Sequence, residues 1–140
     1  MKTLVASTAL ALLLTTGLAT GPASAAQTAT QLITTLPGEA LPISDYYNQN
    51  VYDNRDNKIG EVNDLLVDSA GKVNAVILGV GGFLGVGEKN VAVAFPSLKV
   101  AEKDGKRYLV LDTTKEALQA APGYTYDRSK SAWLPAPKQG

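Results

Sequence analysis

The feature that most constrains this chain is a glycine-rich run between two segments that favour β-structure. Residues 79–87 read Gly-Val-Gly-Gly-Phe-Leu-Gly-Val-Gly, with five glycines in nine positions. The segment before it, 73–80, is uncharged and rich in β-branched residues, and 91–95 follows with the same character. Glycine tolerates positive φ and close backbone approach, which a sharp corner between strands requires. The sequence therefore predicts two strands joined at a tight bend.

This run does not fit a phosphate-binding loop. A dinucleotide loop counted from Gly79 needs its third glycine at position 84, where the chain has Leu84. A P-loop needs Lys directly after its last glycine, and Gly87 is followed by Glu88. Both loops also open a helix, whereas residues 91–95 favour a strand. We expect neither a nucleotide nor any other cofactor here.

Phe83 and Leu84 lie at the centre of the run, and two interpretations of them remain open. They either plug one end of the fold, as buried Phe usually does, or present an exposed apolar patch to a partner or a second copy. Glu88 and Lys89 are expected to form a solvated rim. The candidate interaction residues are therefore Gly82, Phe83, Leu84, Gly85, Glu88 and Lys89.

The remaining pattern predicts more short strands and one helix. In residues 58–67 the apolar spacing shifts after Glu61, which favours a strand with a bulge over a helix. Further strands are expected at 51–52, 98–100 and 107–111, with turns at 53–57, Asp68–Gly71 and Asp104–Gly105. Thr113 and Glu116 form a capping box for a short helix that ends at Pro122-Gly123. Five or six strands and one helix indicate a small closed barrel.

Two groups of acidic residues do not fit a metal site or a catalytic site. An EF-hand starting at Asp53 would have Arg55 where a ligand is needed and Lys58 where glycine is needed. Asp64 and Asp68 are interpreted as hairpin residues rather than a catalytic pair. We therefore expect neither a metal site nor catalytic residues.

The amino-terminal pattern predicts export. Lys2, the apolar run 4–14 and Ala23-Ser24-Ala25 are typical of a signal peptide cleaved after Ala25. A retained transmembrane anchor is the weaker alternative, because the apolar run is shorter than the roughly 20 residues that span a bilayer. The predicted organisation is a signal peptide at 1–25, a flexible tether at 26–44, one domain at 45–124 and a polar tail at 125–140.

Composition excludes several functions. The chain contains neither Cys nor His, which removes thiol nucleophiles, Ser-His-Asp triads, and zinc or haem ligation by these residues. Basic and acidic side chains number 13 each, and removal of Lys2 leaves the mature chain at −1. Without a positive footprint, nucleic acid is not an expected partner. No later segment is predicted to cross a membrane.

The stretch 50–124 resembles the PRC-barrel family. The matching parts are Val51-Tyr52-Asp53 with residues 59–64, Val67-Asp68 with 71–73, the glycine run to Lys89 with 91–93, and 114–122 with Tyr124. The glycine run is the most specific and resembles the version in short exported proteins of proteobacteria. The resemblance implies a small, strongly bent β-barrel with no shared catalytic residues.

These observations together predict a non-enzymatic, periplasmic or otherwise exported interaction or scaffold module. Its partner is expected to be an unidentified protein or a second copy. The alternative is a binder of small molecules or of the envelope surface that uses the glycine run and the aromatic residues near the carboxyl terminus.

Overall fold

The computed structural model describes residues 17, 21, 30–82 and 87–137. Contacts divide the chain into two units, Met1–Leu36 and Pro37–Gly140. In the first unit, residues 30–36 form neither helix nor strand, and Leu32, Ile33 and Leu36 are exposed. No helix in the described parts of the chain is long and apolar enough to cross a membrane.

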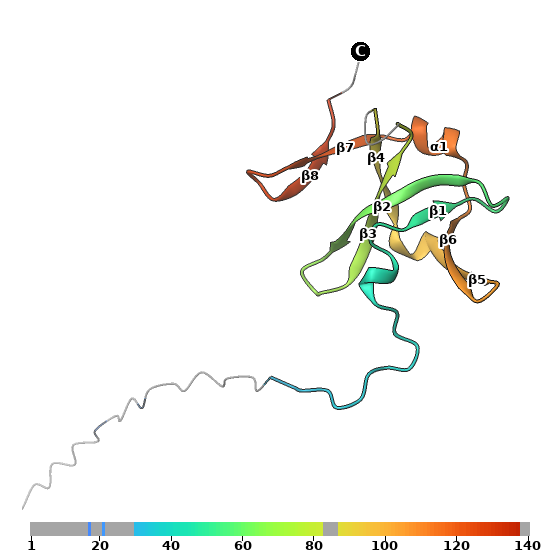
Figure 1. Ribbon diagram of the computed structural model, residues 1–140. Coiled ribbons are helices and arrows are strands. Elements are labelled where there is room, and N and C mark those ends of the chain that lie inside the picture. The colour runs from blue at the N-terminus through green and yellow to red at the C-terminus, as the bar shows by residue number, and fades with distance from the viewer. Residues whose placement is uncertain (1–16, 18–20, 22–29, 83–86, 138–140) are drawn as a thin grey trace, which may run out of the picture. The chain divides into compact units, whose positions relative to one another are not determined.

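The second unit is mainly β, as predicted (Figure 1). Its strands form one eight-stranded sheet in the order β5-β6-β1-β2-β3-β4-β7-β8. The sheet is strongly bent, and among the described residues it does not close, since β5 and β8 are its two edges. The elements are η1 (Ile43–Asp45), β1 (Asn50–Tyr52), β2 (Lys58–Val67), β3 (Val73–Val80), β4 (Lys89–Ala94), η2 (Phe95–Ser97), β5 (Leu98–Lys103), β6 (Lys106–Leu111), α1 (Lys115–Ala120), β7 (Gly123–Asp127) and β8 (Ala132–Pro135).

The core is formed where β2 and β3 cross the middle of the sheet. Residues 76–80 of β3 are all buried, so this part of the strand is covered on both faces. Apart from Ile77, the buried aliphatic side chains form one cluster, which includes Leu118 of α1. The fully buried members of the core are Val51, Ile59, Val62, Val76, Ile77, Leu78, Val80 and Val91.

The predicted bulge in β2 is present. Val62 pairs with Leu78 and Asp64 pairs with Ile77, so that Asn63 is the extra residue. A bulge bends its strand and increases the local twist. This accounts for the shift in apolar spacing along 58–67 and for the sharp curvature of the sheet.

The predicted turns at Asp68–Gly71 and Asp104–Gly105 are confirmed. Asp68 accepts hydrogen bonds from the backbone N–H of Ala70 and Lys72, both at 2.9 Å, and Gly71 has a φ of 81°. Asp104 and Gly105 have φ values of 53° and 70°, as a two-residue turn of type I′ requires.

The helix begins one residue later than the capping box predicts. The N-cap of α1 is Thr114, whose hydroxyl accepts the Ala117 N–H at 3.1 Å. Thr113 instead donates its backbone N–H to the Leu111 carbonyl, which places it in the preceding turn. Leu118 is the buried residue of the helix, so α1 packs onto the sheet through one side.

Residues 125–140, predicted as a polar tail, contain most of a hairpin instead. β7 pairs with β4 through Tyr124 and Gly123, and β8 pairs with β7. Trp133 of β8 donates its indole N–H to the Asp64 carboxylate of β2 at 2.7 Å, and its ring packs on Tyr126. This hairpin adds two strands to the expected five or six, and β8 ends the sheet with Pro135.

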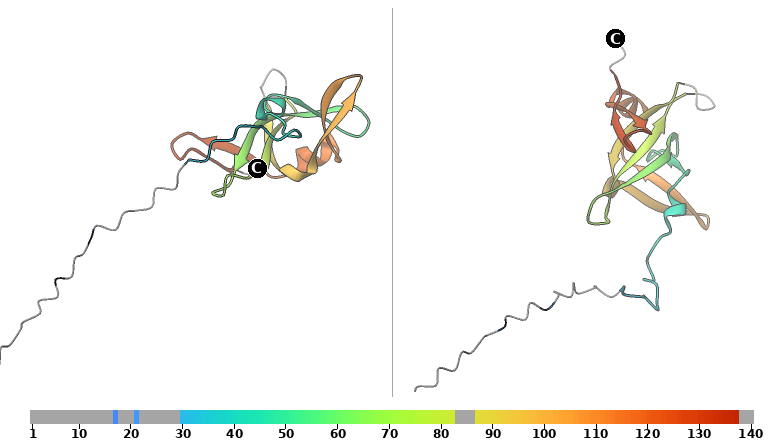
Figure 2. Two further views of the ribbon diagram at one scale, coloured as in Figure 1. Left: turned by 90° about the horizontal axis from the view of Figure 1, so that it is seen from below. Right: turned by 90° about the vertical axis from the view of Figure 1, so that its left-hand side faces the viewer.

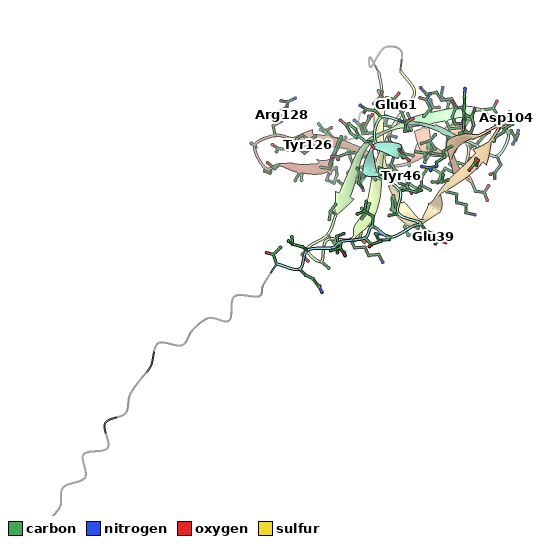
Figure 3. All side chains as sticks on the ribbon, turned by 60° about the horizontal axis from the view of Figure 1, so that its bottom comes forward. Glu39, Tyr46, Glu61, Asp104, Tyr126 and Arg128 are labelled. Carbon is green, nitrogen blue, oxygen red and sulfur yellow. The ribbon has the colours of Figure 1, made fainter. Side chains whose placement is uncertain are left out.

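The two edge hairpins lie at opposite ends of the unit. Figures 1 and 2 show β5–β6 on one side of the central strands and β7–β8 on the other in all three views. In Figure 3, Asp104 marks the tip of the first hairpin, and Arg128 marks the tip of the second.

Candidate functional site

The candidate site is the end of the β3–β4 connection, where the glycine run meets the fold. Gly81, Gly82 and Gly87 have φ values of 74°, 75° and 75°. Residues other than glycine rarely adopt this left-handed conformation, so these three positions depend on glycine. A Cβ on Gly87 would lie 3.9 Å from Gly82 Cα, so the two ends of the connection are adjacent.

Gly79 and Gly60 allow close approach of backbone and side chains beside this corner. A Cβ on Gly60 would lie 2.9 Å from the Gly79 carbonyl oxygen, closer than real side chains are found. A Cβ on Gly79 would overlap the carboxylate of Glu88 and the amide of Asn63. Because Gly79 lacks a Cβ, a cluster of polar side chains that includes Glu88 and Asn63 fits beside its backbone.

That polar cluster joins β2 to the start of β4. The Asn63 amide nitrogen donates to Glu88 Oε1 at 2.5 Å and to Asn90 Oδ1 at 2.8 Å. All three side chains are half-buried, where a hydrogen bond to a charged group is worth more than one in open solvent. Asn63 reaches them because it is the bulged residue of β2, and Gly79 of β3 lies between.

Lys89 is bonded to the helix on the other side of the corner. Its ammonium group donates to the Gln119 carbonyl oxygen at 2.7 Å, near the carboxyl end of α1, where free carbonyls favour a cation. Glu88 and Lys89, predicted to form a solvated rim, are each half-buried, and each has a specific hydrogen-bond partner. Isolated inspection of Glu88-Lys89 could not reveal partners that are 25 and 30 residues away.

A hollow of about 250 Å³ lies next to the corner. Four glycines contribute to its wall, so that backbone is exposed there, and charges of both signs stand around it. One of these pairs, Lys58 and Glu61, is 3.5 Å apart and well exposed, so it contributes little stability. The lining residues are Lys58, Ile59, Gly60, Glu61, Gly79, Gly81, Gly82, Glu88 and Lys115.

The six predicted interaction residues are only partly described. Gly82, Glu88 and Lys89 stand at the base of the connection. Phe83, Leu84 and Gly85 lie outside the described residues, so both interpretations of Phe83 and Leu84 stay predictions. The sequence did not indicate Asn63, Asn90 or Gln119. The shift in apolar spacing that predicted the bulge pointed to the position of Asn63. No sequence pattern pointed to Asn90 or Gln119.

The acidic residues considered as metal or catalytic groups serve turns and packing. Asp53 accepts hydrogen bonds from the side chain and backbone of Asn57 and from the backbone of Arg55, and the first of these does most to hold its pKa below the ordinary value. Asp64 binds Trp133, and Asp68 closes its own turn. The described residues contain no cluster of three or more groups suited to a metal ion.

The fold and the site together define a small, strongly bent β-sheet module whose glycine corner is fixed by side chains from neighbouring elements. Residues 38–118 match the family model of the PRC-barrel domain. The chain therefore belongs to the PRC-barrel family, as the sequence resemblance implied. A comparison with curated proteins finds no match.

Proposed function

We propose that this chain is a non-catalytic, exported PRC-barrel module that binds a protein partner, or a second copy of itself, through the β3–β4 connection. The observation that carries the proposal is the fixed base of that connection. Gly82 and Gly87 are adjacent, Glu88 is bonded to Asn63, and Lys89 is bonded to Gln119. A fixed base lowers the entropy lost when the residues that it carries bind a partner.

The sequence between those anchors supplies the contact chemistry. Residues 83–86 are Phe-Leu-Gly-Val, an uncharged apolar tetrapeptide. Large apolar and aromatic side chains dominate the binding energy of protein interfaces. We assign the contact to Gly82, Phe83, Leu84, Gly85, Glu88 and Lys89, with Phe83 and Leu84 as its centre.

Crosslinking in living cells tests this assignment. A photo-crosslinking residue replaces Phe83 in the full chain, and a matched variant carries it at Val67, which is 58% exposed at the far end of β2. We expect a discrete crosslinked protein, or a dimer of this chain, from position 83 and none from position 67. Equal recovery from both positions, or none from either, would contradict the proposal.

Export is the second part of the proposal and has its own test. The proposed cleavage after Ala25 leaves a mature chain that begins at Ala26. Cell fractionation is expected to find the chain in the periplasm, and amino-terminal sequencing is expected to begin at Ala26. A full-length cytoplasmic chain would overturn export and leave the interaction test intact.

The hollow beside the glycine corner favours one alternative, a binder of small molecules or of envelope components. Its exposed glycine backbone and four charged side chains could hold a small polar molecule. Thermal unfolding in the presence of lipids, polysaccharides and metabolites tests this. An unfolding temperature that no compound raises would count against the alternative.

A further inference from the structure

The edge strand β5 leaves backbone groups unpaired in a regular pattern. β5 and β6 pair without a bulge from Leu98↔Leu111 to Lys103↔Lys106, and the turn between them has two residues. In such a hairpin the last pair is hydrogen-bonded, and bonded pairs then alternate with non-bonded ones. The N–H and C=O groups of Val100 and Glu102 therefore point away from β6, along the outer edge of the sheet.

A second hollow, of about 120 Å³, is lined mainly by residues of β1 and β6 and reaches β5 at Val100. Leu41, Val100 and Leu109 give it an apolar part, and the ion pair between Arg107 and Asp45 lies among its polar lining residues. Val100 is 38% exposed and belongs both to the hollow and to the outer edge. A strand added outside β5 would place the side chain opposite Val100 next to it, at the end of the hollow that Val100 lines. The other lining residues are Gln49, Asn50, Tyr52 and Tyr108.

The opposite face of the hairpin is basic. Lys99, Lys103 and Lys106 share it, because side chains alternate along a strand and Lys103 lies opposite Lys106. Lys103 pairs with Asp56 at 2.9 Å. Lys99 and Lys106 form no ion pair within the part of the chain that the structure describes. Lysines on an edge strand discourage pairing in general, but a strand with acidic residues on that face would complement them.

We propose that β5 accepts an extended strand of a partner protein in which acidic and apolar residues alternate. Backbone hydrogen bonds to Val100 and Glu102 hold the strand, the hollow takes one apolar side chain, and the lysine face selects acidic residues on the other side. This is a second interaction surface. It shares no residue with the β3–β4 connection, so either surface can fail without the other.

Amide hydrogen exchange on the exported protein tests the proposal. The probe is a blocked peptide, Glu-Val-Glu-Leu-Glu-Val, and the control peptide has Lys in place of each Glu. In the free protein we expect the N–H groups of Val100 and Glu102 to exchange faster than those of Lys99, Ala101 and Lys103. At saturating acidic peptide we expect the first two to slow by about tenfold or more, with no change from the basic peptide.

Two variants separate the components of binding. Val100→Glu places a charge at the hollow and is expected to raise the Kd of the acidic peptide by about tenfold or more. Lys99→Glu is expected to raise the Kd of the acidic peptide by about threefold and to make this Kd less dependent on salt. Val67→Glu, the same change at an exposed strand end elsewhere, is the matched control and should bind like the unaltered chain.

Three outcomes would overturn the proposal. One is the absence of binding by the acidic peptide, and another is equal binding of the two peptides. The third is slow exchange at Val100 and Glu102 that grows with protein concentration without peptide, which would show that a second copy occupies the edge.

Discussion

Because Gly79 has no side chain, the side chains of Glu88 and Asn63 can pack directly against its backbone. The space where its Cβ would lie is filled by the Glu88 carboxylate and the Asn63 amide. Gly79→Ala should therefore lower the free energy of unfolding by about 1–3 kcal/mol, as overpacking does. Urea denaturation measures this. In a Glu88→Ala background the same change should cost less, and an equal cost in both backgrounds would show that the overlap does not involve Glu88.

Gly82 and Gly38 offer a contrast in backbone conformation. Gly82 has a φ of 75°, which a β-branched residue cannot adopt without strain, whereas a Cβ on Gly38 meets no atom within 4 Å. Gly82→Val should lower the melting temperature by several degrees, and Gly38→Val should leave it nearly unchanged. Equal melting temperatures would refute the left-handed corner.

Asp68 links its turn to pH. The hydrogen bond from the backbone N–H of Lys72 does most to hold the pKa of Asp68 below its ordinary value. A hydrogen bond from the Asn74 side chain also lowers this pKa. A carboxyl with a lowered pKa stabilises the fold above its unfolded pKa, about 3.9, and that stability is lost as pH falls through the folded pKa. Asp68→Asn should therefore lose less stability than the unaltered chain between pH 7 and about pH 3.

Urea denaturation at both pH values measures this difference. Glu39→Gln, at an exposed residue of the segment before η1, is the control and should behave like the unaltered chain. A loss in Asp68→Asn as large as in the unaltered chain would show that the turn does not couple to pH.

At the scale of elements, only one of two neighbouring threonines caps α1 with its side chain. Thr114→Ala removes the hydroxyl that accepts the Ala117 N–H and should cost about 1 kcal/mol of stability. Thr113→Ala should cost less, because Thr113 contributes its backbone rather than its side chain to the preceding turn. Thermal denaturation of the two variants measures the difference, and the opposite order would favour the capping box at Thr113.

Local chemistry predicted those elements whose residues determine their own conformation. The turns at Asp68–Gly71 and Asp104–Gly105 were predictable because their φ values and hydrogen bonds depend on the residues of the turn itself. The run 73–80 was predictable because a strand buried on both faces needs continuous apolar residues. The bulge at Asn63 was also visible, because it interrupts the apolar pattern of β2.

Contacts between distant residues explain what the sequence did not show. β7 and β8 depend on Tyr124 pairing with Asn90 and on Trp133 bonding Asp64, 69 residues earlier. Their own sequence is polar and contains prolines, which is typical of a tail. In the candidate site, glycine conformations were predictable from composition, whereas the partners of Glu88 and Lys89 arise only when the sheet and helix come together.

For the whole molecule, the carboxyl-terminal hairpin extends the family domain. The family model matches residues 38–118, and β7–β8 follows that range while belonging to the same sheet. Trp133 is the only tryptophan in the chain, so its fluorescence reports on this hairpin. We expect the fluorescence and the far-ultraviolet circular dichroism to change together during unfolding. A fluorescence change that came first would show that the hairpin unfolds separately.

The proline at the end of β8 bears on how copies of this protein can assemble. The Ala136 N–H bonds the Gly123 carbonyl, so that Trp133 and Pro135 are the residues of β8 whose backbone faces outward, and Pro135 has no N–H to donate. A filament needs two complementary edges, so that each copy can add to the next. With one edge blunted by Pro135, an association of copies through β5 on each would stop at a symmetric pair. Open-ended polymerisation through this sheet is thereby disfavoured.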